Sequence, residues 1–220
     1  MRGLFEGTRG QLEFNLPWMG WNLFLAFLPW AISVVVFRPS RRITVLWVFW
    51  AAVCVAFLPN AAYVLTDIIH LPGAVRFEES DRVVLVAIIP MYTALFVLGF
   101  GAYVDAVRHM SAFVVARGWQ RHRWPLELVV HAASSVGIYV GRIKRFNSWD
   151  LWQEPGDVAR ETWHAFGRPL AAAGMVLTFV ILTIGYAIAR PIFDYLIAKA
   201  FGGVATPDGM LSGADVKNES

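Results

Sequence analysis

Five long apolar runs alternate with short polar segments along the chain. They span residues 18–37, 43–66, 83–104, 126–141 and 170–189. About 20 apolar residues in a helix cross the hydrocarbon core of a bilayer. The first, second, third and fifth runs reach that length. The run at 126–141 is shorter and more polar. The pattern predicts an all-α polytopic membrane protein with about five transmembrane helices.

The segments outside these runs predict the rest of the organisation. Residues 1–17 form an N-terminal extramembrane segment, 18–190 the transmembrane helical domain, and 191–220 a C-terminal segment with a Gly-rich polar tail that is expected to be disordered. Between the fourth and fifth runs, apolar residues recur at helical spacing after Pro155. They predict a short amphipathic helix on the membrane surface, with a plain ordered loop as the alternative.

Prolines and small residues predict how the helices bend and pack. Kinks are expected at prolines inside three of the runs, Pro29, Pro59 and Pro90. The fourth run carries small residues at intervals of four, Ala133, Gly137 and Gly141. Such a stripe lets another helix approach closely, so this helix is expected inside the bundle. Gly174 and Thr178 give the fifth run a shorter stripe of the same kind.

Composition supports the membrane assignment. Hydrophobic residues make up 57% of the chain and the mean hydropathy is +0.53, more apolar surface than a soluble domain of this size could bury. The formal net charge is only +3, and the basic residues cluster in loops. We interpret them as topology determinants and lipid contacts, and expect no nucleic-acid partner. The single cysteine, Cys54, excludes an intrachain disulfide, and no cofactor is expected.

Two polar motifs end the second and fourth runs. The first is PNAAYVLTDIIH at 59–70, with candidate residues Asn60, Tyr63, Thr66, Asp67 and His70. The second is GRIKRFNSWD at 141–150, with candidate residues Arg142, Arg145, Asn147, Trp149 and Asp150. Because successive membrane helices alternate in direction, both motifs are expected at one membrane face. The start of the first run adds Asn15, Trp18 and Asn22 there.

This gathering has a structural and a functional interpretation. In the structural one, Asp67 and Asp150 pair with Arg142 and Arg145 and lock the helix ends together. In the functional one, the guanidinium groups bind an anionic ligand such as a lipid phosphate. A metal held by Asp67 and His70, with Asp150, is a further alternative. Because no motif of a metalloprotease, serine hydrolase or P-loop enzyme is present, no metal is assigned and enzymatic activity stays open.

A second polar set is expected at the opposite face. It comprises Asp105, Arg108 and His109 after the third run, and Glu127 and His131 in the fourth. Pairing with Arg108 or Arg123 is the structural interpretation. A proton relay would need ionisable groups that continue inward. The basic residues of the loop around 117–123, against the basic-poor stretch 67–82, favour a multi-pass cell-membrane protein with its N-terminus outside and its C-terminus cytoplasmic.

The two motifs resemble a family of bacterial membrane proteins known as domain of unknown function 1361. Its pattern has an N-terminal Trp-Asn, here Trp21–Asn22, followed by PNAPY-x-x-TD-x-x-H and SSFGIYLGR-x-x-R-x-NSWD. The second stretch appears here as SSVGIYVGRIKRFNSWD at 134–150. The similarity spans about residues 18–190 and departs at Ala62 and Val136, where the family has Pro and Phe. It implies the same candidate residues and supplies no activity.

The leading functional prediction is an integral membrane protein that binds an anionic lipid headgroup or envelope precursor, with membrane lipid as its partner. One alternative is an intramembrane hydrolase or transferase acting on a lipid-linked substrate. Another is a small transporter, which is disfavoured because the first, third and fifth runs contain no charged residue deep inside them.

Overall fold

The computed structural model describes residues 2–76, 78, 80–143, 153 and 155–200. Every regular element within these residues is a helix, and no strand occurs among them. This confirms the all-α class predicted from the apolar runs. The expected disordered tail, at 201–220, lies outside the described residues.

Four helical stretches in the described part of the chain are long and apolar enough to cross a membrane. The first is α1 (Arg2–Val36), and the last is α9 (Pro169–Ala200). The second joins α2 (Val45–Tyr63), the 3₁₀ segment η1 (Val64–His70) and α3 (Leu71–Arg76). The third joins α4 (Asp81–Val83), the π-helical segment η2 (Val84–Ile88) and α5 (Ile89–Val115). The chain is therefore a multi-pass membrane protein.

The fourth predicted run also forms a helix but is not among these four. It follows a short 3₁₀ turn, η3 (Gln120–His122), and is α6 (Arg123–Ile143). Polar residues such as Glu127 and His131 lower its hydropathy. The amphipathic segment forms the expected helix, α8 (Pro155–Phe166). Its position on a membrane surface stays a prediction.

α1 begins much earlier than its apolar run because its polar residues share one face. Four of them follow helical spacing: Gln11, Asn15, Trp18 and Asn22. Asn15 is only 3% exposed, and the Gln11 amide nitrogen donates to Glu78 Oε2 at 3.0 Å. The polar face is thus turned toward the protein, and it extends the helix beyond the stretch that hydropathy marks.

Within the long helical stretches, two segments depart from α-helical hydrogen bonding. η1 links α2 to α3, and η2 links α4 to α5. Pro90 is the second residue of α5, which continues η2 without a break, so this proline lies directly after the π-helical departure from α-helical hydrogen bonding. Pro29 and Pro59 lie inside α1 and α2 as predicted.

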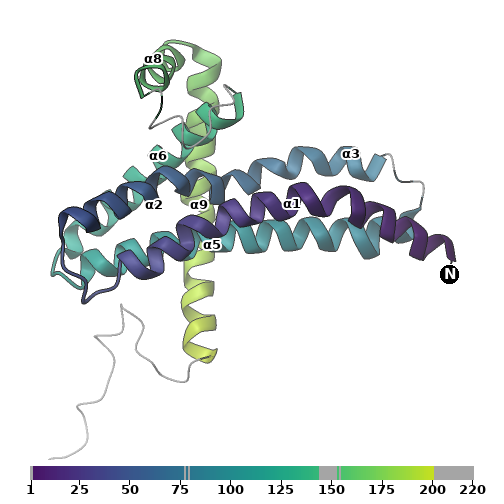
Figure 1. Cartoon of the computed structure of the whole chain (residues 1–220), viewed down its shortest axis with the longest axis horizontal. Coiled ribbons are helices and arrows are strands. Elements are labelled where there is room, and N and C mark those ends of the chain that lie inside the picture. The colour runs from purple at the N-terminus through teal and green to yellow at the C-terminus, as the bar shows by residue number, and fades with distance from the viewer. Residues whose placement is uncertain (1, 77, 79, 144–152, 154, 201–220) are drawn as a thin grey trace, which may run out of the picture.

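The helices α1, α2 and α5 run side by side along the molecule, and α9 crosses them steeply (Figure 1). α6 packs against both α2 and α9. The core between the helices holds fully buried side chains, among them Leu58, Ile88, Leu95 and Tyr103.

Gly137 marks the closest approach of α6 to α2. A Cβ added there would lie 2.4 Å from Cγ of Pro59, so the predicted stripe does face another helix at this position. Counted from the first residue of each helix, Gly137 in α6 and Pro59 in α2 occupy the same position. At Gly174 a Cβ would meet no atom of the described residues within 4 Å, so this position does not mark a close contact of α9 with another described helix. The tight position of α9 is Gly185, against Phe100.

Single cysteines are expected to report which helix ends share a membrane face. Arg117 donates to the backbone carbonyl of Arg41, so the α1–α2 and α5–α6 connections lie together. Arg41→Cys and Arg121→Cys should therefore react with an impermeant maleimide from one side, and Glu78→Cys from the other. Native Cys54 is 0% exposed and should stay silent. Labelling of positions 41 and 78 from the same side would contradict the arrangement.

Candidate functional site

The first motif places a buried carboxylate beside α1. Asp67 lies in η1 and is 2% exposed. The Asn22 amide nitrogen donates to Asp67 Oδ2 at 3.0 Å. The structure thus brings together Asp67 and Asn22, as expected from alternating helix direction.

Aromatic side chains surround this contact. The Trp18 indole donates to Asn15 Oδ1 at 3.1 Å, and its ring meets those of His70 and Tyr92 edge-on, with centroids 5.8 and 6.1 Å apart. Sequence reasoning missed Tyr92, since it lies in an uncharged apolar run. The one feature of the sequence near Tyr92 that suggested a special position was Pro90, two residues earlier. We call Asn15, Trp18, Asn22, Asp67, His70 and Tyr92 the Asp67 cluster.

The 3₁₀ form of η1 sets the direction of its side chains. Residues three apart eclipse one another in such a helix, so Asp67 and His70 lie on one line along it. Asp67 is nevertheless buried and His70 exposed. The Thr66 hydroxyl donates to the Tyr63 carbonyl at 2.6 Å, and Asn60 and Tyr63 are half-buried in the last turn of α2.

The second motif is only partly within the described residues. Arg142 lies in the last turn of α6, just beyond the contact of Gly137 with Pro59, but its side chain is outside the described part. Four further candidates also lie outside it: Arg145, Asn147, Trp149 and Asp150. Pairing of these residues with Asp67 stays a prediction. Among the described residues, no group of three or more His, Cys, Asp or Glu side chains could hold a metal.

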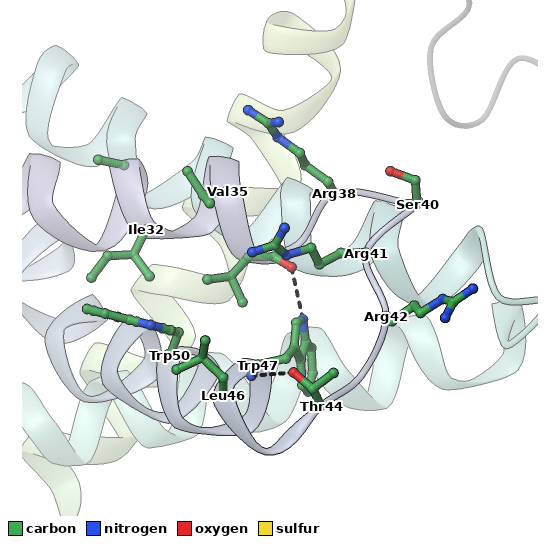
Figure 2. A pocket seen from close by; sticks show the side chains of 12 residues that line it. Ile32, Val35, Arg38, Ser40, Arg41, Arg42, Thr44, Leu46, Trp47 and Trp50 are labelled. Atoms are coloured by element: carbon green, nitrogen blue, oxygen red, sulfur yellow. Dashed lines mark hydrogen bonds between the residues drawn. The ribbon is translucent and has the colours of Figure 1, made fainter.

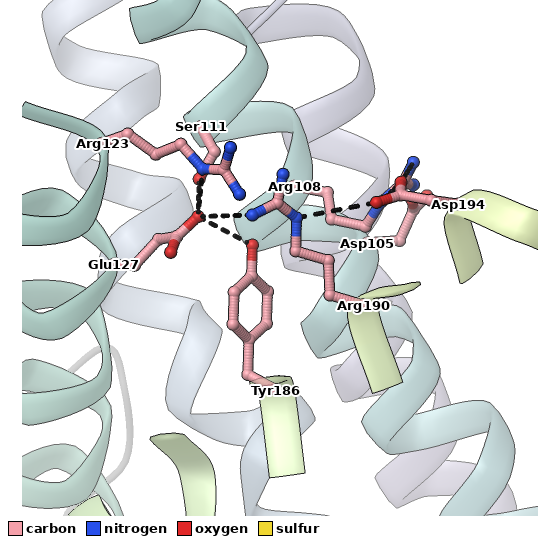
Figure 3. Close-up of polar contacts among 8 residues, drawn as sticks. All are labelled: Asp105, Arg108, Ser111, Arg123, Glu127, Tyr186, Arg190 and Asp194. Carbon is pink, nitrogen blue, oxygen red and sulfur yellow. Dashed lines mark hydrogen bonds and ion pairs between the residues drawn. The ribbon is translucent and has the colours of Figure 1, made fainter. Parts of the chain in front are cut away.

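The second polar set forms a charge cluster between α5, α6 and α9 (Figure 3). It contains three carboxylates and three guanidinium groups: Asp105, Arg108, Arg123, Glu127, Arg190 and Asp194. Formal charges therefore balance within it. We call these six residues the charge cluster.

Glu127 is the most buried acid of the charge cluster, with its side chain 5% exposed. Its Oε1 accepts from Ser111 Oγ at 2.7 Å, from the Tyr186 hydroxyl at 3.1 Å and from Arg123 Nε at 3.2 Å. Arg190 lies 3.6 Å from the same oxygen. The predicted pairing of Glu127 with Arg123 is confirmed, and two of the other donors come from α5 and α9.

Arg108 connects α5 to α9. It donates to Asp105 on its own helix, and its Nε donates to Asp194 Oδ1 at 2.9 Å. Asp105 also accepts from the Trp30 indole of α1 at 2.9 Å. Sequence reasoning missed Asp194, because the fifth apolar run was ended before the charges at 190–194.

His131 does not join the ion pairs. Its Nδ1 lies 2.7 Å from the Tyr103 hydroxyl, and its ring packs against Tyr186 with centroids 5.0 Å apart. Its Nε2 is buried and has no hydrogen-bond partner in the part of the chain that the structure describes. The expected pairing of His131 with an arginine is therefore not seen.

A groove of about 830 Å³ opens between the end of α1 and the start of α2 (Figure 2). Its apolar wall includes Ile32 and Val35 of α1, and Leu46, Trp47 and Trp50 of α2. Three arginines of the connecting loop, Arg38, Arg41 and Arg42, also line it. Among its described lining residues none is acidic. We call it the α1–α2 groove.

The loop beside the groove is held by polar and aromatic contacts. The Thr44 hydroxyl caps α2 by accepting from the Trp47 N–H at 3.1 Å, and the Trp47 indole donates to the Val36 carbonyl at 2.9 Å. The Trp47 ring stacks on Phe113 of α5 with centroids 5.0 Å apart. The backbone is thus fixed, while the three arginine side chains remain exposed.

A family model with the description "Protein of unknown function (DUF1361)" matches residues 21–184. This region runs from the middle of α1 into α9, and includes both polar motifs, the α1–α2 groove and much of the charge cluster. No curated protein and no solved structure matches the chain. Since the model covers well over half of the sequence, the chain belongs to the DUF1361 family, as the resemblance of its two motifs implied.

Proposed function

We propose that this protein binds an acidic phospholipid of the membrane in the α1–α2 groove. The acyl chain lies along the apolar wall of α1 and α2, and the phosphate lies at the arginines of the loop. The anionic-lipid function is the one predicted from the sequence. The position proposed here differs from the predicted one, since the groove lies at the start of α2 and the first motif at its end.

The observation that carries this proposal is the combination of surfaces in one groove. Its volume is within the range of about 300–1,000 Å³ that small-molecule sites have. Its walls are aliphatic and indole side chains, which suit a hydrocarbon chain. Arg41 points over the mouth of the groove, while the side chains of Arg38 and Arg42 extend outward from the same loop (Figure 2). A guanidinium fork suits the oxygens of a phosphate.

The surrounding charges support the same ligand. The loops at 37–44 and 116–122 contain five arginines and no carboxylate, and Arg117 joins them through the Arg41 carbonyl. Basic loops favour the cytoplasmic side of a membrane, where acidic lipids attract basic segments. We therefore propose that this end of the bundle faces the cytoplasm, with the N-terminus outside.

The Asp67 cluster is the second candidate position for an anionic headgroup. It is favoured by the burial of Asp67 against Asn22, since a carboxylate near the hydrocarbon boundary calls for cationic partners. Arg142 and Arg145 are the proposed cations there, with Asn147, Trp149 and Asp150 beside them.

Replacing the three loop arginines tests the groove. The triple variant Arg38→Gln, Arg41→Gln, Arg42→Gln should retain dioleoyl phosphatidylglycerol about a hundredfold less well than the parent chain, because each basic residue near a membrane surface contributes roughly 1 kcal/mol. Native mass spectrometry from detergent measures the retained lipid. Retention by the parent should also weaken with added salt.

A charge-matched control separates the groove from the net charge of the protein. Arg9→Gln, Arg76→Gln, Arg82→Gln removes the same number of charges from the other end of the bundle. It should retain the lipid like the parent. Equal loss in both triple variants, or no loss in the groove variant, would refute lipid binding in the groove.

A further inference from the structure

The chemistry of the α1–α2 groove points to a particular class of headgroup. We infer that its preferred ligand is a lipid with a terminal phosphate or diphosphate, and not a phosphodiester lipid. This inference rests on the proposed lipid-binding function and adds the nature of the headgroup to it.

The first argument is the imbalance of charge at the groove. Three guanidinium groups line it, and its described lining residues include no carboxylate. No ion pair joins Arg38, Arg41 or Arg42 to an acid within the described residues. The charge cluster shows the opposite arrangement, since each of its arginines faces a carboxylate. A phosphodiester would offset one positive charge of the groove, whereas a phosphomonoester carries about 1.5 to 2 negative charges near neutral pH.

The second argument is the number of acceptor oxygens. A terminal phosphate offers three strong acceptors, whereas a diester phosphate offers only two unsubstituted oxygens. The Nε of Arg38 donates to the Val34 carbonyl at 3.2 Å and so caps the end of α1. The two terminal nitrogens of the Arg38 guanidinium can still donate to a ligand. Arg41 and Arg42 are exposed with whole guanidinium forks. Only Arg41 points over the groove, and the exposed side chains of Arg38 and Arg42 would turn toward the phosphate on binding, so that three forks meet three terminal oxygens (Figure 2).

The third argument is the direction of α2. This helix begins at Val45, directly after the loop, with Thr44 as its N-cap. The positive end of the helix dipole therefore faces the same loop as the three arginines. α1 ends at Val36 beside the same loop, so the negative end of its dipole offsets part of this effect, and the guanidinium groups supply the main attraction.

The hydrocarbon part of the ligand follows from the walls. Ile32 and Val35 face Leu46 and Trp50 across the groove (Figure 2), and apart from the Trp50 indole N–H these walls are apolar. A water-soluble phosphate would leave these walls bare, so the groove suits a phosphate joined to an acyl or prenyl chain.

A competition between matched lipids tests the headgroup. The purified parent chain is mixed with dioleoyl phosphatidic acid, phosphatidylglycerol and phosphatidylcholine, and retained lipid is measured by native mass spectrometry. At pH 7.5 phosphatidic acid should be retained about fivefold or more over phosphatidylglycerol, the ratio for one added interaction of the size seen for a basic residue at a membrane surface. At pH 5, below the second phosphate pKa of about 6, the ratio should approach one.

The outcomes distinguish this inference from the proposed function. Equal retention of both acidic lipids, above phosphatidylcholine, would overturn the headgroup inference and leave acidic-lipid binding intact. Equal retention of all three would overturn both. Excess glycerol 3-phosphate should not displace phosphatidic acid, and displacement would show that the groove binds soluble phosphate instead.

Single variants locate the preference. Arg41→Gln should lower the ratio of phosphatidic acid to phosphatidylglycerol severalfold, because Arg41 points over the mouth of the groove (Figure 2). Arg121→Gln removes an exposed arginine from η3, beyond the groove, and should leave the ratio unchanged. A similar fall in both variants would mean that surface charge, and not the groove, selects the lipid, which would overturn the inference.

Discussion

Replacement of Glu127 by glutamine is expected to lower the free energy of unfolding by about 3–5 kcal/mol, the usual cost of removing one partner of a buried ion pair. Glutamine keeps the shape of the side chain but removes its charge. Ser111, Arg123, Tyr186 and Arg190 all approach the same Glu127 oxygen. Arg123 and Arg190 would then lose the Glu127 carboxylate, and Arg190 would keep Asp194 at 3.7 Å. Thermal or SDS denaturation in detergent measures the loss.

Glu13 offers a matched control for this variant. Arg9 and Glu13 form an ion pair of the same spacing as Arg123 and Glu127, but both of their side chains are more than 60% exposed. Exposed pairs contribute about 0–1 kcal/mol. Glu13→Gln should therefore change stability little. If Glu127→Gln were equally harmless, the charge cluster would not hold α9 to α5 and α6.

Gly137→Leu is expected to destabilise the bundle by about 1–3 kcal/mol through overpacking. A Cβ at this position would already lie 2.4 and 2.9 Å from the Pro59 ring. A proline ring has no free rotamer through which to yield, so α6 and α2 would have to separate. The variant should also disturb the end of α2, where the first motif begins. Thermal unfolding in detergent gives the measurement.

Gly174→Leu is the corresponding control in α9. Within the described part of the chain, no atom lies within 4 Å of a Cβ built there, and leucine is a better helix former than glycine. This variant should keep or slightly raise the melting temperature. Equal melting temperatures for Gly137→Leu and the parent chain would show that α6 does not pack tightly on α2.

The sequence predicted the helices well where apolar residues were continuous. It did not predict the helix at the start of α1. A stripe of polar residues lowers the mean hydropathy of that stretch even when the stripe is buried against other helices. The contact of Gln11 with Glu78 and the burial of Asn15 explain why that stretch is nevertheless helical. The end of α9 failed for a related reason. The charges of Arg190 and Asp194 were interpreted as the end of a membrane-spanning helix. Each of them instead forms an ion pair inside the protein.

The candidate sites were predictable to different degrees. The proximity of Asp67 and Asn22 could be predicted from helix direction alone. Successive membrane helices alternate in direction, so the start of the first helix and the end of the second lie at one membrane face. The α1–α2 groove was not predicted, since Arg38, Arg41 and Arg42 looked like ordinary topology signals. Its existence depends on how Trp47 is anchored against Phe113, a tertiary contact that no local pattern encodes.

The lengths of the helices have a consequence beyond the bilayer. α1 and the stretch Asp81–Val115 each contain 35 residues, or about 52 Å of helix, and about 49 Å at the average tilt of 20°. A bilayer with its headgroups is about 40–45 Å thick. α1 ends beside the arginine loop, and its opposite end carries Arg9 and Glu13. With the arginine loop at one membrane face, we expect the opposite end of α1 to project about one helical turn beyond the headgroups. We expect a soluble protein or polymer on that side to contact ordered helix surfaces before it contacts lipid. The hydrogen bond from Gln11 to Glu78 holds these surfaces together.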